Sequence, residues 1–158
     1  MAGESVNIMP ADDAVAGWAG VVYITYLDTN KRFVFARVKK VDAKVKFNNS
    51  KLSILGSRMK KHKQGTGEGT GSATMYYCDS MMRKKAEEYK DKGKLFRFDM
   101  EVYNEDVGSN KTMQATTLKD CLIDELVLAK IDADSEYIEE DISFTFDDFS
   151  VDETFEDK

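Results

Sequence analysis

Residues 41–47 spell VDAKVKF, a stretch in which apolar and polar side chains alternate without a break. Val41, Val45 and Phe47 point to one side of an extended chain, and Asp42 and Lys44 point to the other. A period of two residues is typical of a strand with one face buried and one face in water. The stretch therefore predicts a half-buried β-strand.

The residues just upstream follow the same period in the opposite phase. Val34, Ala36 and Val38 are apolar there, and the phase changes at Lys39 and Lys40. One extra residue in a strand moves every later side chain to the other face, which is the effect of a β-bulge. We expect a bulge at this point, so that one apolar face continues through the whole run.

The same period recurs along most of the chain. Residues 95–103 place four apolar side chains on an inner face, namely Phe96, Phe98, Met100 and Val102. Further strands are expected at residues 21–27, 51–55, 73–78, 112–122, 126–131 and 142–146. Turn residues separate most of these runs. The pattern predicts one mainly β domain over residues 1–158, an antiparallel barrel or sandwich.

One segment, about residues 80–92, has the period of a helix instead. Ser80 is expected to cap it and Gly93 to end it. Its inner face is formed by Met82, Ala86 and Tyr89. Arg83 and Glu87 are four residues apart and are expected to pair on the exposed side. A single short helix has no core of its own, so it should flank the sheet.

Charge is distributed unevenly along the 158 residues, whose formal net charge is −6. Residues 31–63 hold twelve Lys or Arg against one acid, and residues 120–157 hold fifteen acids against one Lys. Such asymmetry fits a nucleic-acid-binding face or an acidic tail. It fits equally well copies of one protein that dock head to tail.

Two further features concern the compartment. No apolar run reaches the length of a membrane span, and the first seventeen residues lack the pattern of a secretion signal. Only Cys78 and Cys121 are present, without metal-ligand spacing. We expect two ordinary buried or half-buried thiols and a cytoplasm as the place of synthesis.

The stretch KKHKQGTGEGTGS at residues 60–72 combines bases with alternating glycines. A phosphate-binding loop would need Lys where Ser72 stands, and a helix after it instead of the expected strand. Glycine also gives backbone freedom. We therefore expect a long hairpin arm at about residues 50–75 with a flexible tip at 56–72. The arm's candidate assembly residues are Arg58, Lys60, Lys61, His62, Lys63, Gly65, Gly67, Gly69 and Gly71.

Catalysis has little support in the sequence. The only histidine, His62, belongs to a basic loop, and no nucleophile has a partner at a recognisable spacing. We expect no enzyme, no cofactor and no metal. The rival interpretation is a small nucleic-acid-binding module that uses the basic loop 58–63, and a nucleotide-binding enzyme is a weaker third.

The order and spacing of several short stretches resemble one family, the tail tube proteins of contractile bacteriophage tails. The similarity is to tubes of defective prophages of the PBSX type and of phage-tail-like bacteriocins. It covers roughly residues 50–149. The matching stretches are LGSR at 55–58, HK at 62–63, GTGS at 69–72, MYY at 75–77, Arg83, residues 86–89, Phe98, Val102, NED at 104–106, TTLKDC at 116–121, VLAK at 127–130 and ISFTF at 142–146.

The resemblance implies a structural protein with a β-barrel-like fold and one flanking helix. Family members form six-membered rings that stack into a hollow tube inside a sheath, and a hairpin arm reaches the next ring. Implied partners are further copies of the chain, the sheath, baseplate, terminator and tape-measure proteins, and DNA passing through the bore of a phage tail. Location would be the tail of a virion or phage-tail-like particle.

The bore and the chain ends raise further expectations. An acidic bore would repel the DNA backbone and let it slide, and Asp99 and Glu101 are candidates to line it. The ends, an N-terminal arm at 1–17 and an acidic C-terminal tail at 150–158, match the family pattern less well.

Overall fold

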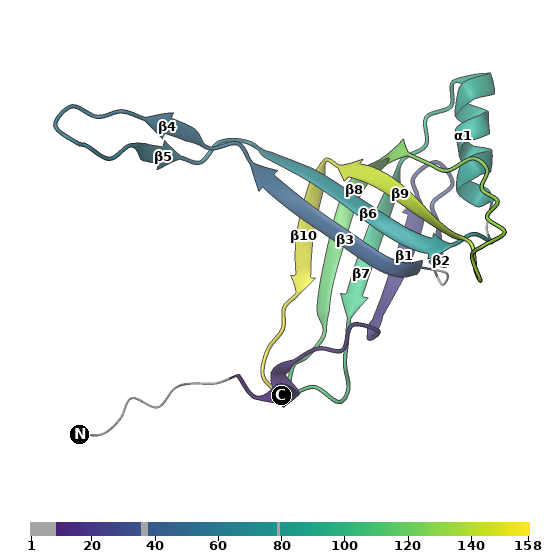
Figure 1. Cartoon of the computed structure of the whole chain (residues 1–158), viewed down its shortest axis with the longest axis horizontal. Coiled ribbons are helices and arrows are strands. Elements are labelled where there is room, and N and C mark those ends of the chain that lie inside the picture. The colour runs from purple at the N-terminus through teal and green to yellow at the C-terminus, as the bar shows by residue number, and fades with distance from the viewer. Residues whose placement is uncertain (1–8, 36–37, 79) are drawn as a thin grey trace.

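A computed structural model of the chain describes residues 9–35, 38–78 and 80–158 (Figure 1). Within this part lie strands β1 (Gly20–Tyr26), β2 (Lys31–Val34), β3 (Val38–Phe47), β4 (Ser50–Leu52), β5 (Lys61–Lys63), β6 (Gly67–Tyr76), β7 (Phe98–Asn104), β8 (Gln114–Glu125), β9 (Glu139–Phe146) and β10 (Asp148–Glu153). Helix α1 spans Met81–Lys92, and a short 3-10 helix, η1, spans Ala11–Asp13. The prediction of a mainly β protein with one helix is confirmed.

The strands form two layers that share β8. The strand order is β2-β1-β7-β8-β9-β6-β3, with β10 paired to β8, and every pairing is antiparallel. The first half of β8 pairs with β7 and β10, and its second half pairs with β9. In Figure 1, β3, β6 and β9 cross in front of β10, β8, β7 and β1. The fold is therefore a sandwich rather than a closed barrel.

Strand β8 changes layers at Asp120, which has a left-handed backbone with φ 53°. The β7–β8 register shifts between Phe98 and Met100 at the same place. Asp99, between those two residues, accepts the backbone N–H of Asp120 at 3.1 Å. Asp tolerates this conformation better than most non-glycine residues. The bend thus rests on Asp120 and on the Asp99 carboxylate.

The core lies between the layers and draws on both. Phe98 and Met100 of β7 are fully buried, as are Ile142 and Phe144 of β9. The rings of Phe98 and Phe144 meet edge to face with centroids 6.3 Å apart. The inner faces predicted for residues 95–103 and 142–146 are confirmed, because alternate side chains of a strand must point to the same layer.

The bulge expected just upstream of the first quoted stretch is also present. The pairing of β3 with β6 shifts register between Val38 and Lys40. Val38, Val41 and Val45 are all half-buried, so the apolar face continues across the shift. Ala36, which belonged to the same prediction, lies outside the described residues.

Helix α1 has nearly the predicted limits, and Gly93 ends it with φ 67°. The Ser80 side chain makes no capping hydrogen bond, so that prediction is wrong. Met82 packs against the core, whereas Tyr89, two turns further along, is 52% exposed and is not among the residues packed against it. Arg83 turns inward to Glu140 instead of pairing with Glu87 on the exposed side. Arg83 pairs with Glu140 rather than Glu87 because the buried Glu140 carboxylate needs a neutralising charge, whereas an exposed carboxylate is solvated by water.

Two predicted segments differ from the structure. Residues 126–131 form a loop rather than a strand, since no described strand pairs with them. The Val127 and Leu128 carbonyls accept hydrogen bonds from the side chains of Arg83 and Tyr77 instead. The expected acidic tail at 150–158 begins as β10, and beyond it the Lys158 N–H donates to the Asn110 carbonyl at 2.8 Å. Both corrections come from contacts between distant parts of the chain.

The expected N-terminal arm, residues 1–17, is described only from residue 9. Here the Ala16 N–H donates to the Asp106 carboxylate at 3.0 Å, and the Ser109 hydroxyl donates to the Asp12 carbonyl at 3.1 Å. Residues 1–8 lie outside the described part. The described N-terminal segment and the C-terminal end thus contact the same β7–β8 loop, residues 105–113.

Candidate assembly surfaces

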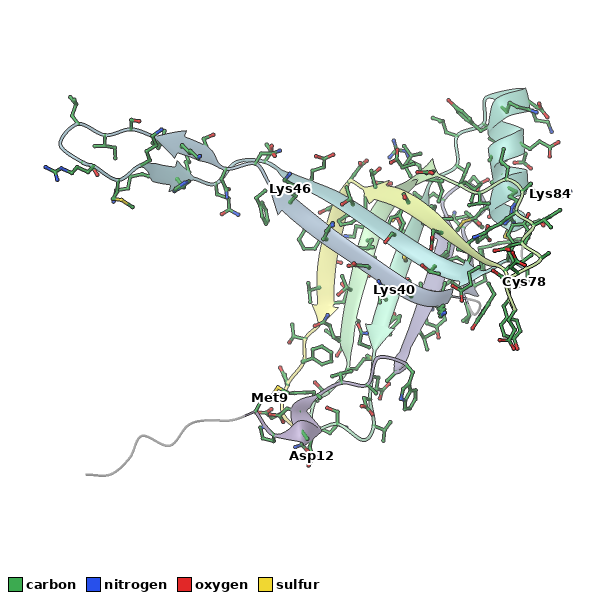
Figure 2. All side chains as sticks on the ribbon, in the orientation of Figure 1. Met9, Asp12, Lys40, Lys46, Cys78 and Lys84 are labelled. Atoms are coloured by element: carbon green, nitrogen blue, oxygen red, sulfur yellow. The ribbon has the colours of Figure 1, made fainter. Side chains whose placement is uncertain are left out.

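A long hairpin leaves the body of the molecule and continues β3 and β6 outward. The β3–β6 ladder runs from Val38 to Phe47, but β6 pairs with β9 only from Gly69 onward. Farther out, β4 and β5 pair with each other alone. We call residues 48–66 the arm. Figures 1 and 2 show it projecting beyond both layers, with Lys46 near its root.

The arm combines bases with exposed apolar side chains. Its five candidate basic residues are all exposed, namely Arg58, Lys60, Lys61, His62 and Lys63. Within the described part of the chain, none of the five forms an ion pair. Leu55 and Met59 at the tip are 102% and 75% exposed. Such a surface, unsatisfied in a single chain, is suited to contact a partner.

The glycines of the quoted stretch do not all lie in the arm's tip. Gly67, Gly69 and Gly71 are part of β6, and Gly69 and Gly71 have a ladder on each side. The expected loose tip at 56–72 is therefore wrong for residues 67–72. The described tip, between β4 and β5, contains Gly56 with φ 81°.

Close packing explains why glycine is required in β6. A Cβ on Gly69 would overlap the ring of Phe146, and one on Gly71 would overlap the ring of Phe144. A Cβ on Gly67 would lie 3.2 Å from the ring of Phe47. Gly65, at the base of the arm, would overlap the Asn48 carbonyl. These glycines provide space for aromatic rings and backbone rather than backbone freedom.

Asp99 and Glu101 lie on the outer face of β7, opposite the core. Glu101 accepts hydrogen bonds from Arg32 at 2.8 Å and from the Tyr103 hydroxyl at 2.8 Å. The Glu101 carboxylate thereby raises the pKa of Tyr103. Asp99 supports the bend at Asp120, as described above. Both acids are thus held by neighbours, and they share one polar face of the β1–β7–β8 layer.

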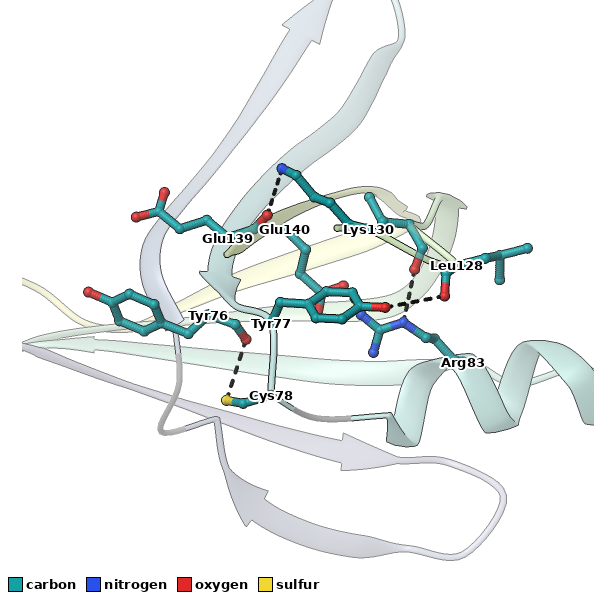
Figure 3. Close-up of polar contacts among 9 residues, drawn as sticks. Tyr76, Tyr77, Cys78, Arg83, Leu128, Lys130, Glu139 and Glu140 are labelled. Atoms are coloured by element: carbon teal, nitrogen blue, oxygen red, sulfur yellow. Dashed lines mark hydrogen bonds and ion pairs between the residues drawn. The ribbon is translucent and has the colours of Figure 1, made fainter. Parts of the chain in front are cut away.

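A polar network that the sequence did not predict connects α1 to β9 (Figure 3). Arg83 forms an ion pair with Glu140, a side chain only 3% exposed. The Arg83 guanidinium also lies 4.3 Å from the centroid of the Tyr77 ring and donates to the Val127 carbonyl at 3.0 Å. The alternation of β9 could have predicted that Glu140 is buried, because Glu140 lies two residues from Ile142 and four from Phe144 and so points to the same face of the strand.

The remaining sequence candidates contribute no reactive centre. His62 is exposed on β5. Cys78 is exposed, contrary to expectation, and Cys121 is buried, which raises its pKa to about 12. Within residues 9–35, 38–78 and 80–158, no three His, Cys, Asp or Glu side chains are grouped to hold a metal ion. The same residues include no helix long and apolar enough to cross a membrane.

The fold and surface together define a class of protein: a two-layer antiparallel β-sandwich with one flanking helix and a projecting arm that exposes bases and apolar side chains. Comparison with known proteins gives the family. The family described as "Phage tail tube protein" matches residues 7–153. The chain belongs to this family. It is a structural component of the tail of a phage or phage-tail-like particle, and it is not an enzyme.

Individual relatives agree with this assignment. The chain is 36% identical over 122 residues to the Phage-like element PBSX protein XkdM of Bacillus subtilis (strain 168), covering 77% of this chain and 83% of XkdM. A chain in the 6-fold symmetrised cryo-EM structure of the anti-feeding prophage baseplate matches with a TM-score of 0.66 at 11% identity. The match covers 91% of this chain and 96% of the other.

A second structural match is a chain in the PVC sheath-tube complex, an extracellular contractile injection system in its extended state. Its TM-score is 0.68 at 7% identity, covering 89% of this chain and 93% of the other. At such low identity these structures establish the fold alone. Nothing among the matches supports the rival interpretation of a nucleic-acid-binding module.

Proposed function

We propose that this chain assembles into six-membered rings, which stack into the hollow inner tube of a contractile tail. The arm carries the proposal, because residues 48–66 project beyond the body with exposed bases and apolar side chains. In the proposed tube the arm contacts the adjacent ring through Arg58, Lys60, Lys61 and Lys63. Contacts that close give rings, and contacts that do not close give filaments; a stacked tube needs both.

The bore of the proposed tube is lined in part by Asp99 and Glu101. These acids share a polar outer face with Tyr103 and Arg32. Their carboxylates would repel a DNA backbone and so favour passage without adhesion. In a headless particle the same tube would instead breach a membrane.

The proposed partners beyond the chain itself are those of a contractile tail. They are a sheath protein around the tube, a baseplate that templates its growth, a terminator and a tape-measure protein. Family membership supports this set. DNA would pass through the bore if the parent particle is a phage.

Negative-stain electron microscopy of the purified chain across a concentration series tests the proposal. We expect hollow tubes or six-membered rings, whose fraction grows with concentration because association follows mass action. Analytical ultracentrifugation of the same samples gives the mass of the smallest assembly. A chain that stays monomeric at every concentration, also when mixed with its baseplate proteins, contradicts the proposal.

A further inference from the structure

The β8–β9 loop, residues 126–138, exposes three large apolar side chains and several acids. Leu128, Ile131 and Tyr137 are 71%, 95% and 68% exposed. The loop carries the acids Asp132, Asp134 and Glu136 against one base, Lys130, and the neighbouring Glu139 of β9 is paired with Lys39 at 2.7 Å. Scattered apolar side chains are common on protein surfaces, but several on one short loop indicate a contact site.

The network around Arg83 holds this loop in place without a strand ladder (Figure 3). Arg83 donates to the Val127 carbonyl at 3.0 Å, and the Tyr77 hydroxyl donates to the Leu128 carbonyl at 3.5 Å. The Lys130 ammonium donates to the Glu139 carbonyl at 2.8 Å. A loop fixed in advance loses little entropy when a partner binds to it.

The arm has the complementary composition, with apolar residues flanked by bases. Leu55 at its tip and Ile131 on the loop are the most exposed apolar side chains of the two surfaces, at 102% and 95%. The two surfaces cannot meet within one chain. Figure 1 shows the β4–β5 hairpin and α1, beside which the loop is held, at opposite ends of the longest axis.

We propose that the β8–β9 loop is the surface on which the arm of a second copy of this chain docks. Apolar contact between Leu55 and Ile131 forms the centre, and the arm's bases face Asp134 and Glu136 at the rim. Contact between opposite ends of identical chains is heterologous, so it repeats from copy to copy. The inference rests on the proposed function, since it names the receptor of the same arm.

Site-directed crosslinking tests the contact without requiring tubes. Two full-length chains are mixed, one with Leu55→Cys and one with Ile131→Cys, both in a Cys78→Ser background and one carrying an affinity tag. Cys121 is buried and protonated, so it does not react. A short bismaleimide then joins the two chains. As a matched control, Val107→Cys replaces Ile131→Cys. Val107 is also an exposed apolar residue, at 85% compared with 95% for Ile131.

We expect the tagged and untagged chains to be joined about tenfold faster with Ile131→Cys than with Val107→Cys, because docking raises the effective concentration of the thiols. Equal rates overturn the inference. Rings or tubes without preferential crosslinking mean that the proposed function holds and the docking site is wrong. Preferential crosslinking without rings or tubes means that the docking site is right and the proposed function is wrong.

A charge exchange tests the rim independently. Asp134→Lys with Glu136→Lys, or Lys60→Glu with Lys61→Glu, should each reduce crosslinking about tenfold, because like charges then face each other. Mixing the two charge-reversed chains should restore it. The same reversal at Glu153 and Glu156 in the C-terminal segment is the control and should have no effect. Failure of the mixed pair to recover contradicts direct contact between these charges.

Discussion

Gly71 shows at the scale of one residue why the quoted glycine stretch is a strand. Any Cβ at this position would overlap the buried ring of Phe144 and approach the Asp42 carbonyl at 3.0 Å. We predict that Gly71→Ala lowers the free energy of unfolding by about 1–3 kcal/mol, the usual cost of overpacking. Urea denaturation followed by circular dichroism measures it.

The matched control for Gly71→Ala is Ser72→Ala at the next position of β6. Ser72 is exposed on the opposite face of the strand, so its truncation should change stability little. Equal effects of the two substitutions would contradict the steric role that the Phe144 ring gives to Gly71.

At the scale of elements, α1 is attached to the body largely by charge. Lys85 pairs with Asp28 at 2.7 Å, and Lys94 lies 3.7 Å from the same carboxylate. The hydrogen bond from Lys85 lowers the pKa of Asp28 below its ordinary value of 3.8. A lowered carboxyl pKa stabilises the fold above pH 3.8, and the stabilisation is lost as the pH falls through the folded-state pKa.

We therefore predict that Asp28→Asn destabilises the protein by about 1–2 kcal/mol at neutral pH, since a charged hydrogen-bond partner is removed. The difference from wild type should shrink as the pH falls below 3.8. Urea denaturation at a series of pH values measures it, with Asp91→Asn on the exposed side of α1 as control. A difference that stays constant into acid would exclude the Asp28 carboxylate as its source.

The ion pair between Arg83 and Glu140 connects α1 to β9 in a region nearly closed to water, with the side chains 14% and 3% exposed. We predict that Arg83→Met lowers the free energy of unfolding by about 3–5 kcal/mol, because the buried Glu140 carboxylate loses its ion pair with the guanidinium. Adding Glu140→Gln should recover part of the loss. Lys84→Met, one residue along on the exposed side, is the control.

A double-mutant cycle of urea denaturation curves gives the coupling between Arg83 and Glu140. Purely additive effects would mean that the two side chains act independently. The same variants bear on assembly, since Arg83 also holds the β8–β9 loop through the Val127 carbonyl.

At the scale of the whole molecule, we expect folding and assembly to depend on different residues. The body holds the core, whereas the four arm bases Arg58, Lys60, Lys61 and Lys63 are exposed and belong to no core cluster. We predict that changing all four to Ala leaves the thermal midpoint nearly unchanged but makes tubes shorter and more salt-sensitive. Calorimetry and electron microscopy at several salt concentrations measure the two effects.

Four bases outside the arm provide the matched control for this variant. Lys31, Lys84, Lys90 and Lys92 are exposed, and changing them to Ala removes the same charge. Tubes of the arm variant that are as long and as salt-resistant as wild type would contradict a role for the arm's charges in stacking.

The sequence alone determined the class of fold and most of its inner faces. Alternation in VDAKVKF and in residues 95–103 is a local property, because neighbouring side chains of a strand must point to opposite faces. The phase change at Lys39 and Lys40 likewise predicted the bulge. Resemblance, rather than alternation, gave the family.

Only the tertiary structure decided which distant residues meet. The glycines of β6 pack under rings of β9, and Asp99 supports the bend at Asp120. The Val127 and Leu128 carbonyls accept hydrogen bonds from side chains instead of from a strand. A local pattern predicts whether a side chain points toward the core or toward solvent, but it does not predict which other side chain it will contact. Those partners come from far along the chain, so they exist only once both layers have packed.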